Sequence, residues 1–140
     1  MNCLLSQDDL SFKNQVEQCT FPIQEFSHRN HVRLAYIYLV NNDASHATQL
    51  MRSTLVNLLN YYKVDPTKYS ETLTQSWILL VMHFMAKTNQ ALSSENFIEQ
   101  NTQLLDSAII YTYYSKAVLV SERARLAFVE PDLEIIPIAL

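Results

Sequence analysis

The most apolar part of the chain is residues 70–86, which read SETLTQSWILLVMHFMA. With about 3.6 residues per helical turn, the apolar side chains of this stretch form two adjoining sets. Leu73, Trp77, Leu80, Val81 and Phe84 share one face, and Ile78, Leu79, Met82 and Met85 lie beside it. A helix that is apolar over so much of its surface is normally covered by other elements. We therefore expect this segment to be the central helix of an all-α protein.

Helical periodicity also appears on both sides of this segment. The expected helices are residues 28–40 after a Ser27 cap, 44–62 after Asp43 or Ser45, a short one from Ser93-Ser94 through Ile98, 104–114, and 122–129 after Ser121. Residues 1–22 are expected to form a short helix or an arm, and residues 133–140 an extended tail. The pattern predicts a single helical domain over residues 1–140, folded as a compact bundle of five to seven helices.

Composition excludes several function classes. The 140-residue chain contains no glycine, so it has no Walker loop, Gly-rich dinucleotide turn, serine-hydrolase elbow or EF-hand loop. The net charge is −4 and the basic residues are scattered, which argues against nucleic-acid binding. No signal peptide or membrane-spanning stretch is apparent, and Cys3 and Cys19 are expected to be free thiols, with a disulfide as the alternative. These features predict a soluble cytoplasmic protein.

Two histidines at the start of the predicted helix 28–40 could carry chemistry. His28 and His31 share an apolar stripe with Val32 and Ala35, so both imidazoles are expected to face inward. A buried imidazole needs a hydrogen-bond partner or a metal ion. The pair is therefore either a metal-binding His-x-x-His motif or a structural pair bonded to carboxylates or tyrosines.

Glu71 is the expected third metal ligand or a general base. It lies in the first turn of the predicted central helix, where the helix dipole alone would also favour a carboxylate. Thr74 is one turn further on the same face and could orient a water molecule or a substrate. Two histidines and a carboxylate suit Zn, Fe or Mn as a divalent metal.

Other residues have simpler interpretations. His83 lies about 120° around the helix from Glu71 and is expected to be partly buried rather than a ligand. Aromatic side chains such as Trp77 and the cluster of Tyr111, Tyr113 and Tyr114 could line a pocket but are more typical of a core. An arginine of residues 121–125 is expected to pair with Asp106, Glu130 or Asp132 and so tie the tail to the bundle.

Three segments resemble an uncharacterised family of small bacterial all-helical proteins. Phe26 to Ala35 fits F-x-H-x-x-H-x-x-x-A, Tyr69 to Trp77 fits Y-x-E-T-x-T-x-x-W, and Ser121 to Asp132 fits S-x-x-A-R-x-x-F-V-x-P-D. The resemblance implies a shared polar site that includes His28, His31, Glu71, Thr74 and Arg125. In the family a histidine often precedes the glutamate, whereas this chain has Ser70. If that histidine is a ligand in the relatives, this chain has lost the ligand or uses Glu71 or water instead.

Three functional hypotheses follow. The first is a small metal-dependent enzyme that acts on a small molecule, with His28, His31 and Glu71 as ligands and Glu71 and Thr74 as catalytic residues. The second is a non-catalytic helical module that binds a ligand or a protein partner, in which the His/Glu cluster is structural. The third is acid–base catalysis by a His/Glu pair without a cofactor. A homo-oligomer is compatible with each of them.

Overall fold

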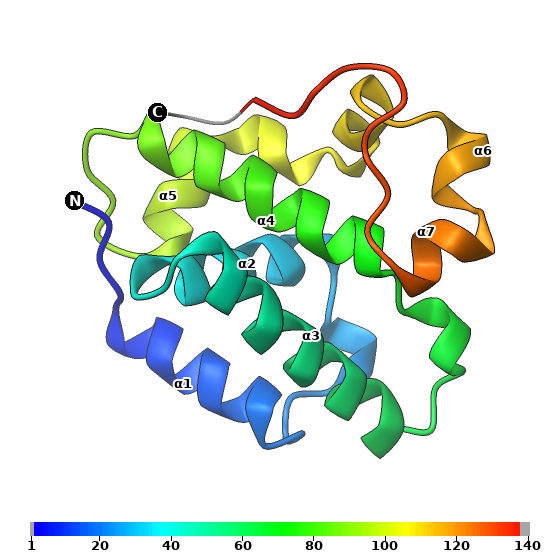
Figure 1. The fold of residues 1–140 in the computed structure, drawn as a ribbon. Helices are drawn as coiled ribbons and strands as arrows, with labels where there is room; N and C mark the ends of the chain where they lie inside the picture. The colour runs from blue at the N-terminus through cyan, green and yellow to red at the C-terminus, as the bar shows by residue number, and fades with distance from the viewer. Residues whose placement is uncertain (1, 138–140) are drawn as a thin grey trace.

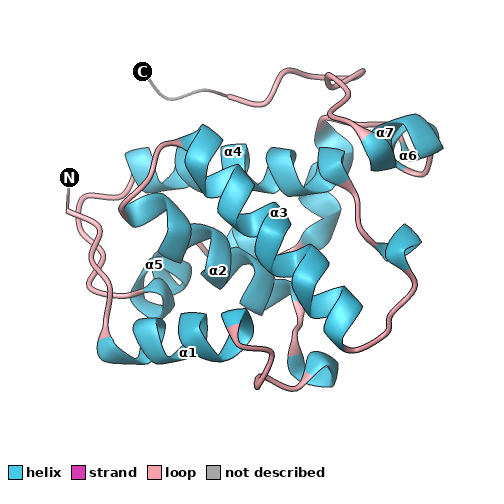
Figure 2. Ribbon diagram, turned by 60° about the horizontal axis from the view of Figure 1, so that its bottom comes forward, coloured by secondary structure: helices cyan, strands magenta, loops and turns pink. Residues whose placement is uncertain are grey.

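Seven α-helices make up most of the described structure, a computed structural model that describes residues 2–137 (Figure 1). The helices are α1 (Gln7–Glu17), α2 (His28–Val40), α3 (Ala44–Tyr61), α4 (Glu71–Ala86), α5 (Ser94–Gln100), α6 (Lys116–Leu119) and α7 (Glu122–Leu126). Four 3-10 helices connect them, η1 (Ile23–Glu25), η2 (Pro66–Lys68), η3 (Thr102–Leu105) and η4 (Ser107–Thr112). Figure 2 shows helices and loops without a strand in the described part. The prediction of an all-α bundle of five to seven helices is confirmed.

A polar side chain caps the first turn of every α-helix in the described chain. The caps are Ser6, Ser27, Asp43, Ser70, Ser93, Ser115 and Ser121, and each accepts a hydrogen bond from a backbone N–H in the first turn. Such a cap satisfies one of the backbone donors that a helix start leaves free. The serine and aspartate residues of the sequence therefore set where these helices begin.

Helices α2, α3 and α4 pack against one another and form the centre of the core. Seven of the 13 residues of α2 are buried, including Tyr36 and Tyr38 with no more than 2% exposure. Helix α4 buries Trp77, Ile78 and Leu80. In Figure 1, α2 lies behind α3 and α4, while α1 and α5 cover its other sides. The burial on two sides explains why the sequence of α2 is apolar beyond a single stripe.

Two helices end without glycine in a backbone conformation that usually requires it. Cys19 follows the end of α1 with φ of 59°, and Lys63 follows the end of α3 with φ of 56°. Beyond Lys63, the Val64 N–H donates to the Leu59 carbonyl at 2.9 Å, and the Lys63 N–H itself donates to Asn60. This pair of bonds is the Schellman motif that closes a helix. The side chain of a residue other than glycine makes the left-handed conformation cost about 1–2 kcal/mol.

A buried carboxylate joins the first helix to α5 and α2. Asp9 is fully buried and accepts hydrogen bonds from the backbone N–H groups of Ser6 and Ser94, at 3.1 and 2.8 Å. The Ser94 hydroxyl also donates to this carboxylate, and Arg33 of α2 lies 3.3 Å from it. Three segments distant in sequence therefore depend on one acidic side chain.

The predicted helix 104–114 is wrong in detail, because the chain forms η3 and η4 there instead of one α-helix. Asp106 separates the two. Its backbone has φ of −86° and ψ of 102°, and its carboxylate accepts a hydrogen bond from the Ala108 N–H at 2.9 Å. Asp106 thus starts a new turn rather than continuing the previous one. Helix α6 is an additional short helix that the sequence pattern did not indicate.

The last helix ends three residues before the predicted boundary at Val129. Thr72 of α4 explains this, because its hydroxyl donates to the Ala127 carbonyl at 3.0 Å and accepts from the Val129 N–H at 3.0 Å. These bonds hold residues 127–129 in an extended conformation across the start of α4. From there the final segment returns over α4 towards the C-terminal end of that helix (Figure 1).

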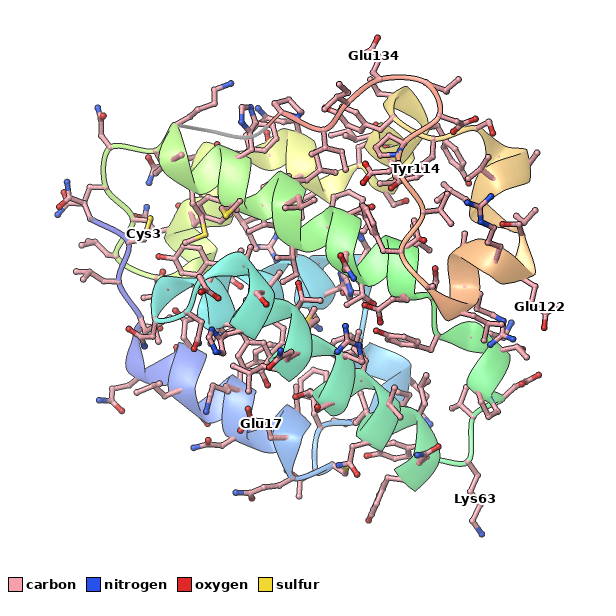
Figure 3. The ribbon with its side chains drawn as sticks, in the orientation of Figure 1. Cys3, Glu17, Lys63, Tyr114, Glu122 and Glu134 are labelled. Carbon is pink, nitrogen blue, oxygen red and sulfur yellow. The ribbon has the colours of Figure 1, made fainter. Side chains whose placement is uncertain are left out.

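Tyr114 and Ser115 hold the same segment further along (Figure 3). The Tyr114 hydroxyl donates to the Val129 carbonyl, and the Ser115 N–H donates to Asp132 at 2.8 Å. The expected ion pair from an arginine to the tail is not found among the described residues, where Arg125 pairs with Glu122 instead. Residues 133–137 contain no helix, and residues 138–140 lie outside the described part. In the described chain, no helix combines the length and apolar character needed to span a membrane.

Candidate functional site

The start of α2 brings the two histidines together, as the sequence predicts. The Ser27 cap begins the helix immediately before His28, so both imidazoles lie in its first two turns. Their ring centroids are 6.4 Å apart and the ring planes differ by 18°. The edge of Trp77 from α4 lies against His28, with 4.5 Å between the ring centroids. The histidines therefore face α4 and are half-buried.

His28 has a structural partner. Its Nε2 lies 2.9 Å from the backbone carbonyl oxygen of Leu104 in η3. A carbonyl oxygen can only accept a hydrogen bond, so Nε2 carries the hydrogen. In a neutral ring this assignment leaves Nδ1 as the acceptor.

His31 has no hydrogen-bond partner for either ring nitrogen among residues 2–137. Burial and, to a smaller extent, the neighbouring His28 lower its pKa to about 4. The imidazole is therefore uncharged at neutral pH and offers one donor and one acceptor. A pKa this low makes His31 a weak base near pH 7, where general acid–base catalysis works best with a group whose pKa is near the ambient pH.

Two neighbouring cavities border His31. The smaller has a volume of about 210 Å³ and is lined largely by apolar surface from η1, α3 and α4. The larger has a volume of about 470 Å³ and lies between the start of α2, α4, η4 and the end of α6. Phe26, His31 and Leu73 line both cavities. His31 is thus the polar group common to both cavities.

Glu71 is committed to a different helix. Its carboxylate accepts two hydrogen bonds from Arg52 of α3, at 2.8 and 2.6 Å, and further bonds from Tyr69 and Gln75. Burial alone would raise the pKa of Glu71, but these hydrogen bonds and the Arg52 charge lower it to about 2. A carboxylate held in this way is a structural anion rather than a free base.

Thr74 is also occupied within its own helix. Its hydroxyl donates to the Ser70 carbonyl at 2.9 Å, one turn earlier in α4. The side chain is nearly buried, with 3% exposure, at the edge of the smaller cavity. Its proton is therefore directed at the backbone rather than at a bound water or substrate.

The structure does not assemble the expected metal ligands. Among the described residues, no group of three His, Cys, Asp or Glu side chains is arranged to hold a metal ion. His28 and His31 are neighbours, but Glu71 is bound to Arg52. The sequence argument proposed Glu71 from its place in the first turn of the central helix and did not foresee the arginine that α3 supplies.

Sequence reasoning missed Arg52 and two aliphatic residues of the larger cavity. Leu119 and Val120 line that cavity from the end of α6, a short helix that the sequence pattern did not indicate. Of the aromatic residues considered above, Trp77 and Tyr111 line the cavity. Tyr114 is instead buried in the core, where the Ser76 hydroxyl donates to its hydroxyl oxygen at 3.2 Å.

His83 lies apart from this site on α4. Its Nδ1 is buried and has no hydrogen-bond partner among the described residues. Burial lowers its pKa, and the nearby Lys87 charge acts in the same direction. The interpretation of His83 as a partly buried helix residue is consistent with this position.

Comparison with known proteins found no match to this chain. No family model matches the chain, and no curated protein or solved structure matches it either. The resemblance to a bacterial helical family therefore stays a prediction, and the case for a functional site depends on the geometry around His31.

Proposed function

We propose that this protein is a non-catalytic helical module that binds a small, largely apolar molecule in the two cavities beside His31. The observation that carries the proposal is the position of His31, whose uncharged imidazole lines both cavities and has no hydrogen-bond partner among the described residues. Small-molecule sites typically combine mostly apolar walls with a few polar groups, within about 300–1,000 Å³. The larger cavity, at about 470 Å³, has this size and composition.

The polar residues around the site support binding rather than catalysis. Glu71 and Thr74 are engaged by Arg52 and the Ser70 carbonyl, so neither is available to move a proton. His28 fixes η3 to the start of α2. Of the predicted site residues His28, His31, Glu71 and Thr74, His31 alone has no side-chain hydrogen bond within the described part of the chain, and its low pKa suits a hydrogen bond to a ligand better than proton transfer.

A fragment screen by ligand-observed NMR tests this proposal, with two surface variants as a matched pair. Ser107 is exposed and lines the larger cavity, so Ser107→Phe places a ring at the cavity without disturbing the core. Ser53 is equally an exposed serine, on α3, and does not border either cavity. We expect bound fragments to lose at least tenfold in affinity in Ser107→Phe and to bind normally to Ser53→Phe. Equal binding by all three proteins, or none, would refute the proposal.

A divalent metal held by His28 and His31 is the competing proposal. In this arrangement Glu71 could become a ligand only by leaving Arg52, which would strand a partly buried guanidinium. Elemental analysis of untagged protein, beside a His28→Ala/His31→Ala double variant, separates the two. Stoichiometric Zn, Fe or Mn that disappears in the double variant would favour the metal site over the binding module.

A further inference from the structure

We propose that the ligand of the larger cavity is an uncharged aromatic molecule with a hydroxyl group, whose alkyl substituent enters the smaller cavity. This inference depends on the proposed function and specifies the chemical class that the site accepts. The argument uses the charges around the cavities, the hydrogen-bonding state of the two histidines and the side chains of each wall.

The charge of the walls favours a neutral ligand. None of the described residues that line the larger cavity is Asp, Glu, Lys or Arg. An anion or cation placed there would lose its hydration without gaining an opposite charge, which is costly. Lys68 borders the smaller cavity, but its side chain is exposed at the edge and stays hydrated.

His31 favours a ligand that donates a hydrogen bond. The Nε2 of His28 is bonded to the Leu104 carbonyl, whereas neither ring nitrogen of His31 has a partner among the described residues. His31 lines both cavities, and burial lowers its pKa, so its uncharged ring has one nitrogen that accepts a hydrogen bond. A hydroxyl group on the ligand can donate to this nitrogen, whereas an ether or a carboxylate cannot.

The wall of the larger cavity favours an aromatic ring. Trp77, Tyr111 and Phe26 all line it, together with the two imidazoles. Aromatic rings pack on one another in edge-to-face or offset arrangements with centroids about 4.5–7 Å apart, and the His28–Trp77 pair already has this geometry at 4.5 Å.

The smaller cavity favours an alkyl group. Its lining is largely apolar and includes Leu55, Leu58, Leu59 and Leu73, and its volume of about 210 Å³ has room for a short alkyl chain. Because Phe26, His31 and Leu73 border both cavities, a para-substituted ring can place its hydroxyl near His31 and direct its chain past Leu73.

Three probes of matched shape test the class, and the chain contains its own reporter. Trp77 is the single tryptophan and lines the larger cavity, so its fluorescence, excited at 295 nm, follows occupancy directly. The probes are 4-propylphenol, 4-propylanisole and 4-propylbenzoate, titrated at pH 7.5. The phenol is neutral and donates, the anisole is neutral and cannot donate, and the benzoate is anionic. We expect the phenol to bind about tenfold more tightly than the other two, the effect of one hydrogen bond.

Variants of His31 show whether that preference arises at this residue. In His31→Phe, which keeps a ring but no nitrogen, the phenol should bind no better than the anisole. His31→Gln keeps an acceptor, so part of the preference should return. Circular dichroism of both variants checks that they are folded, and the Gln variant keeps the test decisive if the Phe variant is not.

The outcomes separate this inference from the proposed function. Equal binding of phenol and anisole, or tightest binding of the benzoate, would overturn the inference while leaving a small-molecule site in place. Failure of all three probes, together with fragment binding that Ser107→Phe does not weaken, would overturn both. Phenol selectivity that persists in His31→Phe would also overturn the inference, because the hydroxyl would then be recognised elsewhere.

Discussion

The partner of Glu71 is Arg52, which is 19 positions away in the sequence, although Lys68 is the nearer basic residue along the chain. The bond from Arg52 uses both guanidinium branches and is supported by Tyr69 and Gln75. Glu71 is 8% exposed, whereas the Arg52 side chain lies nearer the surface, so water reaches the arginine end of the ion pair. Its contribution to stability is therefore smaller than that of a fully buried pair.

We predict that Glu71→Gln lowers the free energy of unfolding by about 1–3 kcal/mol at pH 7. The native pKa of about 2 lies below the ordinary value of 4.5, so this contribution is present above pH 4.5 and is lost as the pH falls towards 2. Urea denaturation of the variant and of an exposed control, Glu99→Gln, measures the effect. An equal loss in the two variants would contradict the structural role of Glu71.

His31 should affect stability in a different pH range. Its native pKa of about 4 lies below the ordinary value of 6.5, so the unfolded chain takes up the proton first as the pH falls. We predict a loss of about 1–2 kcal/mol between pH 7 and pH 5, which His31→Gln should abolish. Denaturation at both pH values measures it, with His46→Gln, at an exposed histidine, as the control. An imidazole proton resonance of His31 that titrates near pH 6.5 would refute the prediction.

At the scale of elements, the absence of glycine has a measurable cost at helix ends. The C-terminal cap of α3 places Lys63 at a φ of 56°, where a β-carbon is unfavourable. The Lys63 side chain is exposed and points away from the body of the molecule (Figure 3). Its replacement therefore removes backbone strain without removing a packed side chain.

We predict that Lys63→Gly raises the free energy of unfolding by about 0.5–1 kcal/mol, although glycine normally destabilises helical proteins. Lys87→Gly is the matched control, because Lys87 ends α4 with a negative φ of −91°. The control should be neutral or destabilised. Urea denaturation of the two variants measures the difference, and destabilisation by both would show that the cap of α3 carries no strain.

The sequence was sufficient for elements whose ends are decided locally. Helices α2, α3 and α7 begin at predicted caps, Ser27, Asp43 and Ser121, because a cap acts on the turn that follows it. The end of α7 was not predictable, since Thr72, more than 50 residues away, holds the chain after it. The split at Asp106 is local but ambiguous, because aspartate can equally lie within a helix.

At the scale of the whole molecule, the site also combines features that neighbouring residues decide with features that depend on distant parts of the chain. The inward direction of His28 and His31 follows from the stripe of α2 and was predicted. The cavities and the Arg52 partner of Glu71 were not, because they depend on how α2, α3, α4 and η4 meet in space. Helix periodicity states which face of a helix is covered but not which residue covers it.

At this scale we make one prediction about stability, which concerns Asp9 because its carboxylate connects α1, α2 and α5. Asp9→Asn removes a buried charge that accepts from Ser6 and Ser94 and lies against Arg33. We expect a loss of about 3–5 kcal/mol in the free energy of unfolding, since the Arg33 charge loses its buried partner. Hydrogen exchange should increase in both α1 and α5. The neighbouring Asp8→Asn, at an exposed position, should change neither, and exchange confined to α1 would show that Asp9 does not join the two helices.

The Asp9 contacts also bear on the order in which a ribosome could complete this fold. Asp9 and Ser94 are 85 positions apart in sequence. At a synthesis rate of about 5–20 residues per second, roughly 4–17 s separate the appearance of the two residues. During that interval the carboxylate and the apolar side of α1 lack part of their final surroundings. Helix α1 can therefore pack on α2 and α3 early, but its buried carboxylate acquires the Ser94 bonds only after α5 has been made.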